Sequence, residues 1–197
     1  MRVVLATGNA GKLAEYRRLL ADVPGLSLES MAEHGGPIEV VEDGDTFHAN
    51  AVKKARAVAA HTGLAAMADD SGLEVDALEG RPGVHSARYA GVDSSDAENN
   101  VKLLVALRDT AGVARSARFR CVIVLVDEAG RELVTVDGAC EGRISETPRG
   151  AHGFGYDPLF IAEGETRTMA ELEPAEKNAI SHRGRASKKL VAALLAR

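Results

Sequence analysis

Several residue types and patterns are scarce in this chain of 197 residues, and each scarcity excludes a class of protein. Tryptophan is absent and aromatic residues make up only 4% of the sequence, so there is no stacking platform for single-stranded nucleic acid. The 24 Lys and Arg are outnumbered by 29 Asp and Glu, whereas general nucleic-acid binders are basic. We therefore expect no nucleic-acid polymer as a partner, and a bound polyanion must meet local positive charge or a metal.

Cysteines and long apolar runs are also scarce. Cys121 and Cys140 are too few for a disulfide framework and indicate two reduced core or sheet residues. No apolar run approaches the roughly 18 residues of a membrane-spanning helix. The polar stretch from Thr7 to Lys12 interrupts the N-terminal apolar run, so a signal peptide is not predicted. These patterns predict a cytoplasmic protein without a membrane partner.

What remains is the composition of a globular protein, with 45% hydrophobic and 27% charged residues. The length predicts a single domain over residues 1–197. Apolar runs typical of strands lie at 3–6, 26–28, 64–68, 118–126, 132–139 and 159–162. Helical patterns lie at 12–20, 47–61, 95–107 and 184–195, with another helix beginning near Pro174. Strands and helices alternating around a central hairpin predict an α/β fold with a mixed sheet and flanking helices.

The first loop carries the strongest local signal. Gly8 and Gly11 allow backbone N–H groups to approach an anion, the following helix adds partial positive charge, and Lys12 adds a full one. A Walker loop has four residues between its glycines and a Ser or Thr after the lysine, so it is excluded here. The pattern favours a nucleotide or phosphate site. The alternative is an ordinary strand-to-helix turn with a lysine exposed in the first helical turn.

Two acidic segments are candidates for a metal site. Asp69 and Asp70 follow the strand predicted at 64–68, and carboxylates at the end of a strand commonly hold Mg²⁺ beside substrate phosphates. One of them could bind metal while the other accepts a proton, and the spacing does not decide which is the base. The segment 42–45 could supply a further ligand. Both segments also have the composition of turns.

A glycine-rich loop with two aromatic residues spans 153–158, and Ser181 to Gly184 place two donors beside a helix start. The loop could lay a ring against a flat ligand, or could simply anchor itself to the core. The second segment by itself resembles a polar junction. Nucleophilic serine chemistry is unsupported because no Gly-x-Ser-x-Gly motif exists, and the histidines and cysteines lack the spacing of zinc ligands.

The order of these motifs along the chain closely resembles that of the inosine triphosphate pyrophosphatase family, over essentially the whole chain. The motifs that carry the resemblance are Thr7-Gly8-Asn9-Ala10-Gly11-Lys12, Thr46-Phe47-His48-Ala49-Asn50-Ala51 with Lys54, Ala68-Asp69-Asp70-Ser71-Gly72, Ser86-Ala87-Arg88-Tyr89, Gly153-Phe154-Gly155-Tyr156-Asp157-Pro158 and Ser181-His182-Arg183-Gly184.

The resemblance implies an elongated, two-lobed fold with a central active-site cleft, a homodimer and a Mg²⁺ requirement. It implies hydrolysis of dITP, ITP and XTP to the monophosphate and pyrophosphate, which cleanses the nucleotide pool. Glu42 and Asp70 would hold the metal, Asp70 would also be the base, and Lys12 would assist catalysis. The implied substrate-binding residues are Thr7, Gly8, Asn9, Ala10, Gly11, Lys12, Lys54 and Ser71 on the phosphate side and Phe154, Gly155, Tyr156, Asp157, Lys177, His182 and Arg183 around the base and sugar.

Two other functions compete with this one. A non-catalytic nucleotide sensor would keep the phosphate loop but lack a working set of carboxylates, which the presence of Glu42, Asp69 and Asp70 disfavours. A pyrophosphatase of the Maf group would share the chemistry but carry a different pocket for the base. In the favoured function, His182 and Arg183 are donors that pair with the 6-oxo group of a purine and disfavour the amino group of ATP.

Overall fold

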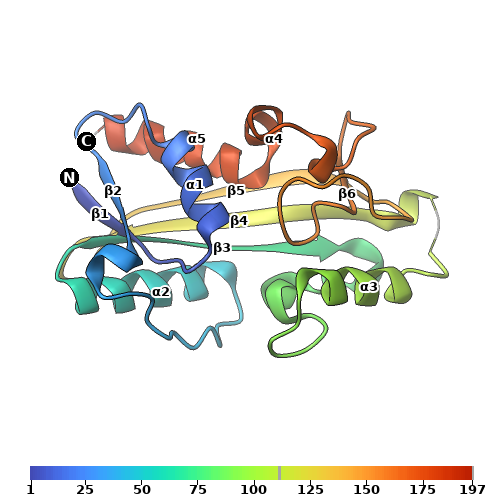
Figure 1. Cartoon of the computed structure of the whole chain (residues 1–197), viewed down its shortest axis with the longest axis horizontal. Helices are drawn as coiled ribbons and strands as arrows, with labels where there is room; N and C mark the ends of the chain where they lie inside the picture. The colour runs from blue at the N-terminus through green and yellow to red at the C-terminus, as the bar shows by residue number, and fades with distance from the viewer. Residues whose placement is uncertain (111, 197) are drawn as a thin grey trace. The chain divides into compact units, whose positions relative to one another are not determined.

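The first strand shows how alternating apolar side chains build the sheet. β1 (Arg2–Leu5) pairs in parallel with β2 (Ser27–Ser30) and with β3 (Ala65–Val75). Val3 and Leu5 pack in the core that contains residues of α1 (Ala10–Leu19) and α5 (His182–Leu195), whereas Val4 packs with α2 (Phe47–Thr62). Because successive strand residues point to opposite faces, helices cover both faces of this part of the sheet (Figure 1).

This computed structural model describes residues 1–110 and 112–196, apart from the Val113 side chain. Its sheet has six strands in the order β2-β1-β3-β4-β5-β6. β4 (Ser116–Val126) and β5 (Glu132–Ile144) form the predicted hairpin, in which the Asp127 amide donates to the Arg131 carbonyl at 3.0 Å. β6 (Phe160–Ala162) is antiparallel to β5. Parallel and antiparallel pairs coexist, so the predicted mixed α/β sheet is confirmed.

The third strand is longer than the sequence predicted. The expected end of the strand at Ala68 is wrong, because β3 continues to Val75 and contains Asp69 and Asp70 in its interior. Both residues are buried, with 2% and 8% of their surface exposed. A buried carboxylate is tolerated only when it is paired and hydrogen-bonded. Their partners Lys12 and Lys54 lie in helices distant in sequence. No signal in the local sequence therefore predicts that the strand continues.

The chain divides into two compact units. Unit 1 comprises Met1–Asp70, Cys121–Gly138 and Gly184–Arg197, and it contains α1, α2 and most of α5. Unit 2 comprises Ser71–Arg120 and Ala139–Arg183. Its core gathers apolar residues of the sheet, such as Leu73 and Phe160, around Leu103 and Leu107 at the C-terminal end of α3 (Asp96–Ala106). Unit 2 also contains α4 (Pro174–Ile180).

Helix ends follow their sequence signals closely. Thr46 caps α2 by accepting the Ala49 amide at 3.1 Å, and Gly63 ends the helix in the left-handed conformation, with φ 68°. Ser95 forms the predicted capping box of α3. Short 3-10 helices complete the fold at Met31–His34, Asp76–Leu78, Gly83–Arg88, Gly112–Arg115 and Met169–Glu171.

Two further expectations concern cysteine and membranes. Cys121 and Cys140 are both buried free thiols. Among the described residues, no helix combines the length and the apolarity needed to cross a bilayer.

Candidate active site

Two adjacent carboxylates of β3 point to opposite faces of the sheet in unit 1. The Lys12 ammonium of α1 lies 3.1 Å from both carboxylate oxygens of Asp69. The Lys54 ammonium of α2 lies 3.1 Å from Oδ1 of Asp70. The preceding residues of β3 alternate in the same way between the core with α1 and the core with α2. Each carboxylate therefore takes its lysine from the helix that covers its own face.

The Asp70 side of the sheet brings the two predicted metal ligands to one cation. The Lys54 ammonium lies 2.6 Å from Oε2 of Glu42 and 3.1 Å from Oδ1 of Asp70. Burial raises the pKa of Asp70, and the Lys54 charge only partly offsets this effect. Burial also acts to lower the pKa of Lys54, but the charges of Asp70, Asp69 and Glu42 outweigh it and leave that pKa raised. The charge state of Lys54 thus depends on those of the carboxylates, and that of Asp70 depends on Lys54.

The position of this ammonium shows that Glu42 and Asp70 can share a cation. Mg²⁺ binds oxygen ligands and commonly takes one or two protein carboxylates, with water and substrate phosphates completing its shell. Within the described residues, no three His, Cys, Asp or Glu side chains form a group suited to holding a metal. A pair of carboxylates without histidine or cysteine therefore fits Mg²⁺ and does not fit zinc.

The predicted phosphate loop becomes part of a helix. The Asn9 side chain caps α1 by accepting the Lys12 amide at 3.0 Å, and Thr7 Oγ1 accepts the Asn9 amide at 3.1 Å. The helix begins at Ala10, so Gly11 and Lys12 lie in its first turn, where backbone amides at the first two positions have no acceptor within the helix. This geometry gives the segment the partial positive charge of a helix N-terminus.

Gly8 and Lys12 of this segment differ in how strongly the rest of the protein constrains them. A Cβ added at Gly8 would meet only Pro37, at 3.9 Å, so the protein's own packing does not require glycine there. Lys12 is half-buried through its contact with Asp69, so the alternative of a lysine exposed in the first helical turn is wrong. The buried carboxylate draws the lysine inward because it must be paired.

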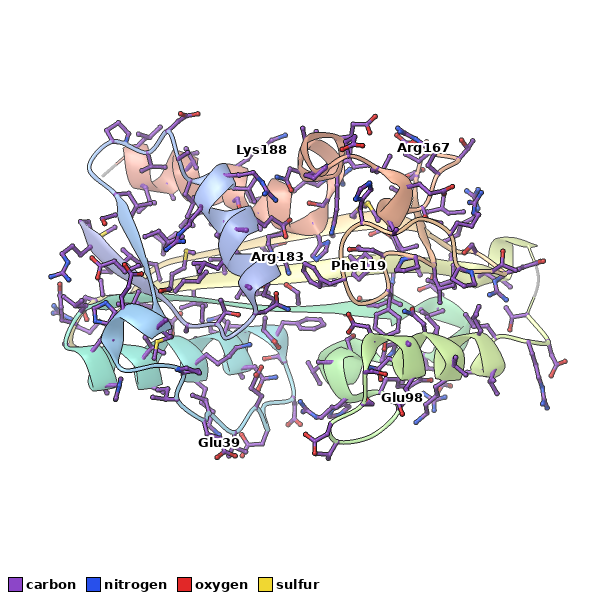
Figure 2. All side chains as sticks on the ribbon, viewed as in Figure 1. Glu39, Glu98, Phe119, Arg167, Arg183 and Lys188 are labelled. Carbon is purple, nitrogen blue, oxygen red and sulfur yellow. The ribbon has the colours of Figure 1, made fainter. Side chains whose placement is uncertain are left out.

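In unit 2, a half-buried aromatic ring is flanked by two cations. The Lys177 ammonium lies 4.9 Å from the centroid of the Phe154 ring, and the Arg183 guanidinium carbon lies 5.5 Å from it. Arg183 is only 1% exposed, and Figure 2 labels it together with Phe119. Cation–π contacts of this kind hold a ring and a cation together while part of the ring stays accessible.

Asp157 fixes the loop that carries this ring. Its Oδ2 accepts the Phe154 amide at 2.9 Å and the Lys177 ammonium at 2.6 Å. Burial raises the pKa of Asp157, and the Lys177 charge acts in the opposite direction. Gly153 has φ 79°, and a Cβ there would lie 2.1 Å from Oδ2 of Asp157. The tight turn around the carboxylate therefore requires glycine at this position.

The remaining predicted residues of unit 2 divide between anchors and polar groups. The His182 ring stacks on Phe119, with centroids 4.7 Å apart and planes 15° apart. Arg183 Nη2 lies 3.4 Å from Oγ of Ser71. Tyr156 points into the core, where its hydroxyl donates to the Ser86 carbonyl at 2.9 Å and burial raises its pKa. The Tyr156 side chain is thus an anchor, and a ligand contact at this position would involve its backbone.

Comparison with known proteins identifies the family of this chain. Residues 3–193 match the model of the Ham1 family. The chain belongs to the Ham1 family. A HAM1 protein from Coxiella burnetii has the same fold, with a TM-score of 0.90 and 45% identity over 100% of both chains. The dITP/XTP pyrophosphatase of Exiguobacterium sibiricum is 50% identical over 194 residues, which are 98% of this chain and 97% of that protein. That of Desulforamulus reducens is 52% identical over 189 residues, covering 96% and 93%.

The family expected from the motifs is confirmed, but the motifs alone missed residues that hold the site of this Ham1 protein. Asp96 Oδ2 accepts the Gly155 amide at 2.6 Å, and Asn100 Nδ2 donates to the Gly155 carbonyl at 2.9 Å. These two residues are four apart on α3 and therefore share a helix face. Asn50 lies within one of the motifs, but the motif alone predicts no role for it. Its spacing from Thr46 places it one turn into α2, and this was the signal available.

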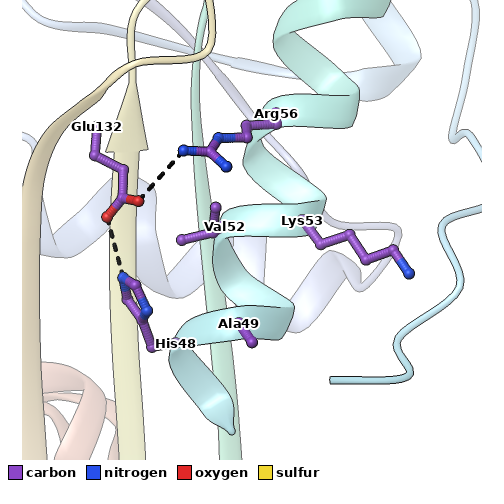
Figure 3. A pocket seen from close by; sticks show the side chains of 6 residues that line it. All are labelled: His48, Ala49, Val52, Lys53, Arg56 and Glu132. Atoms are coloured by element: carbon purple, nitrogen blue, oxygen red, sulfur yellow. Dashed lines mark hydrogen bonds and ion pairs between the residues drawn. The ribbon is translucent and has the colours of Figure 1, made fainter. Parts of the chain in front are cut away.

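A separate groove of about 460 Å³ in unit 1 does not belong to this site. It is lined by five residues of α2, of which only Val52 is buried, and by one residue of β5; they are His48, Ala49, Val52, Lys53, Arg56 and Glu132 (Figure 3). His48 and Arg56 both point toward the Glu132 carboxylate, at 3.0 and 3.5 Å, whereas Lys53 points away. His48 and Arg56 thus already face one carboxylate, and the residues expected to bind substrate or metal are not among those that line the groove.

Proposed function

We propose that this Ham1-family protein is a pyrophosphohydrolase that converts dITP, ITP and XTP to the nucleoside monophosphate and pyrophosphate. The observation that carries the proposal is the single ammonium of Lys54 shared by Glu42 and Asp70, in the same unit as the helix N-terminus at residues 10–12. Lys12, in the first turn of that helix, pairs with Asp69, the residue adjacent to Asp70, so the two parts are linked through neighbouring residues of β3. A cation site linked to an anion-binding element is what a metal-bound triphosphate requires. The names of the relatives supply the substrate class.

The phosphate side of the reaction is assigned to unit 1. Glu42 and Asp70 would hold Mg²⁺, and the bound ion would polarise a phosphate oxygen and neutralise developing charge. Residues 7–12 bind the triphosphate through backbone amides, and Lys12 stabilises the pyrophosphate leaving group. Asp70 accepts a proton from the attacking water. The water oxygen forms a bond to the α-phosphorus while the bond from that phosphorus to the bridging oxygen breaks, releasing pyrophosphate.

Asp70, rather than Asp69, is the base in this assignment. Asp70 lies on the face of β3 that also presents Glu42 and Lys54, while Asp69 takes its lysine from the other face. Asp69 then serves to position Lys12.

The base side is assigned to unit 2. Phe154 stacks on the purine and accepts any purine ring, whereas His182 and Arg183 donate hydrogen bonds to a 6-oxo group. ATP presents an amino donor at that position, and buried donors facing a donor discriminate strongly. Lys177 and Asp157 hold the Phe154 loop, and Ser71 binds on the phosphate side. In this proposal both units act as one catalytic domain over residues 1–197.

Three further properties belong to the proposal. The metal is Mg²⁺, because this ion commonly binds through one or two protein carboxylates beside substrate phosphates. The enzyme is a homodimer, as the motif resemblance implies. Its two buried free thiols are typical of a protein kept in the reducing cytoplasm.

One experiment separates the candidate functions. The protein is incubated with ITP, dTTP or ATP in the presence of Mg²⁺ or excess EDTA, and pyrophosphate and orthophosphate are measured separately. We expect pyrophosphate and IMP from ITP, little product from the other two, and no turnover in EDTA. Turnover of dTTP ahead of ITP would favour the Maf-type function, and nucleotide binding without turnover would favour a sensor. The Asp70→Asn variant is the control for contaminating activity.

A further inference from the structure

We infer that Asn50 is a positioning residue of the metal site, which holds the loop carrying Glu42 at a fixed distance from Asp70. The inference rests on the proposed function, since it concerns the same pair of carboxylates. Asn50 is fully buried in the first turns of α2 and has contacts on both sides of the site. Asn50 is assigned no contact with substrate or metal, and it acts through its hydrogen bonds to Asp70 and to Gly44 of the loop that carries Glu42.

The contacts of Asn50 form a bridge. Its Oδ1 accepts the Gly44 amide at 2.8 Å, and its Nδ2 donates to the Gly44 carbonyl at 3.3 Å. The same Nδ2 donates to Oδ2 of Asp70 at 3.2 Å. Only one orientation of the side-chain amide satisfies all three hydrogen bonds, so the orientation is determined by the network. One side chain thereby links a loop residue two positions after Glu42 to the carboxylate of β3.

The bridge also determines which oxygen of Asp70 faces the shared cation. Asn50 binds Oδ2, and the oxygen close to Lys54 is Oδ1. Without the Asn50 amide, the Asp70 carboxylate could rotate about its terminal torsion, which is broad for aspartate. Outer partners of this kind orient metal ligands, and their loss typically weakens metal affinity by about 10- to 100-fold.

The contact with Asn50 leaves no room for a side chain at Gly44. A Cβ added there would lie 2.7 Å from Oδ1 of Asn50 and 3.0 Å from the Cβ of Ala49. Both atoms belong to the start of a well-packed helix, so the loop rather than the helix would have to move. The Gly44→Ala substitution therefore disturbs the bridge from the loop side while leaving Asn50 and Asp70 unchanged.

The chain offers a matched control in Asn99. Asn99 is also buried, and it occupies the fourth position of α3, as Asn50 does in α2. Its side chain also binds backbone of the preceding segment, accepting the Ala90 amide at 2.7 Å and donating to the Ala87 carbonyl at 3.1 Å. The two asparagines thus share burial and helix position, but only Asn50 also bonds to a predicted metal ligand.

The test titrates nucleotide-free protein with MnCl₂ and follows free Mn²⁺ by electron paramagnetic resonance, in the parent and in Asn50→Ala, Gly44→Ala and Asn99→Ala. Melting curves establish that each variant is folded. We expect the Mn²⁺ dissociation constant to rise about 10- to 100-fold in Asn50→Ala, to rise in Gly44→Ala, and to stay within about twofold in Asn99→Ala. A second readout is the Mg²⁺ concentration needed for half-maximal turnover of ITP, which we expect to shift in the same order.

Two outcomes overturn the inference while leaving the proposed function intact. One is Mn²⁺ binding within about twofold of the parent in both Asn50→Ala and Gly44→Ala. The other is an equal weakening in Asn99→Ala, which would assign the effect to general loss of stability. Glu42→Gln and Asp70→Asn serve as the separate test of the metal site itself. If they bind Mn²⁺ as the parent does, the metal site of the proposed function is wrong, and the inference fails with it.

Discussion

The two units of this Ham1 protein carry different parts of the candidate site and build them by different means. In unit 1, charges pair with one another across short distances: Lys12 with Asp69, and Lys54 with both Glu42 and Asp70. In unit 2, the candidate residues gather around an aromatic ring, with cations lying over it and a buried carboxylate fixing its loop. The first arrangement suits a metal-bound triphosphate, the part that all nucleoside triphosphates have in common. The second suits a base, which distinguishes them.

The contrast extends to how firmly each lysine is held. Lys177 pairs with Asp157 at 2.6 Å, and that carboxylate also accepts a backbone amide. Lys54 instead divides its ammonium between two carboxylates. A lysine shared in this way can leave when a divalent cation arrives, because the carboxylates then keep a positive partner. The comparison predicts that unit 1 substitutions affect every nucleotide alike, whereas unit 2 substitutions act on the base or on its loop.

The largest effect is expected for Asp70 of unit 1, the proposed general base. Asp70→Asn removes the proposed proton acceptor and one proposed metal ligand, and we expect kcat for ITP to fall by about 10²- to 10⁴-fold. The protein should remain folded, because the amide keeps the volume of the carboxylate. Steady-state kinetics and circular dichroism check both parts. A folded variant with kcat near that of the parent would remove Asp70 from the mechanism.

Lys12→Ala comes next. We expect kcat/KM for ITP to fall by about 10²-fold, the usual cost of losing one preorganised donor to a developing charge. Stability should also fall, by about 1–3 kcal/mol, because the buried Asp69 loses its ammonium partner. Lys53→Ala is the matched control, since Lys53 and its partner Asp43 are both exposed and such pairs contribute little. Chemical denaturation gives the two free energies of unfolding, and equal values would contradict the buried pairing.

A smaller effect is expected at the α3 support of unit 2. Asn100→Ala removes the hydrogen bond to the Gly155 carbonyl, so the loop carrying Phe154 becomes less ordered. We expect KM for ITP to rise by roughly 2- to 10-fold, the equivalent of one neutral hydrogen bond, with kcat little changed. A fall in kcat with KM constant would show that this loop serves the chemical step rather than binding.

The smallest effect is the pH dependence of stability in Asp70→Asn. Because the folded-state pKa of Asp70 is raised, the ionised carboxylate costs stability once the pH exceeds that pKa, and the cost is absent below the ordinary aspartate value. The variant cannot ionise at this position. We therefore expect its Tm to equal or exceed that of the parent near neutral pH, with the difference shrinking as the pH falls toward about 4. Melting curves across this range check the sign, and a difference that grows in acid would contradict it.

Much of the fold was predictable because its signals are local. The N-caps Thr46 and Ser95, the left-handed Gly63 and the alternating apolar residues of β4 all lie within a few residues of the element they define. The candidate site residues likewise follow from short motifs, because each motif needs particular residue types at a fixed spacing, and their roles stay predictions.

The parts that escaped prediction depend on partners distant in sequence. β3 continues through two carboxylates because their lysines arrive from 57 and 16 residues away. The Gly155 support comes from an asparagine 55 residues earlier. Asn50 was visible in a motif, yet its role depends on where the 42–45 loop and β3 meet it. Side-chain hydrogen bonds to backbone leave no periodic pattern in a sequence, so these positioning residues emerge only from the fold.

The selectivity ratio most directly tests whether unit 1 serves the triphosphate and unit 2 serves the base. It is measured as kcat/KM for ITP divided by kcat/KM for ATP, in the parent, Lys12→Ala and Arg183→Ala, each checked by its melting curve. We predict a parent ratio well above one, a ratio within about twofold of the parent in Lys12→Ala, and a ratio at least about tenfold narrower in Arg183→Ala through loss of activity on ITP. A parent that hydrolyses ATP as readily as ITP, or a ratio that moves equally in both variants, would contradict the account.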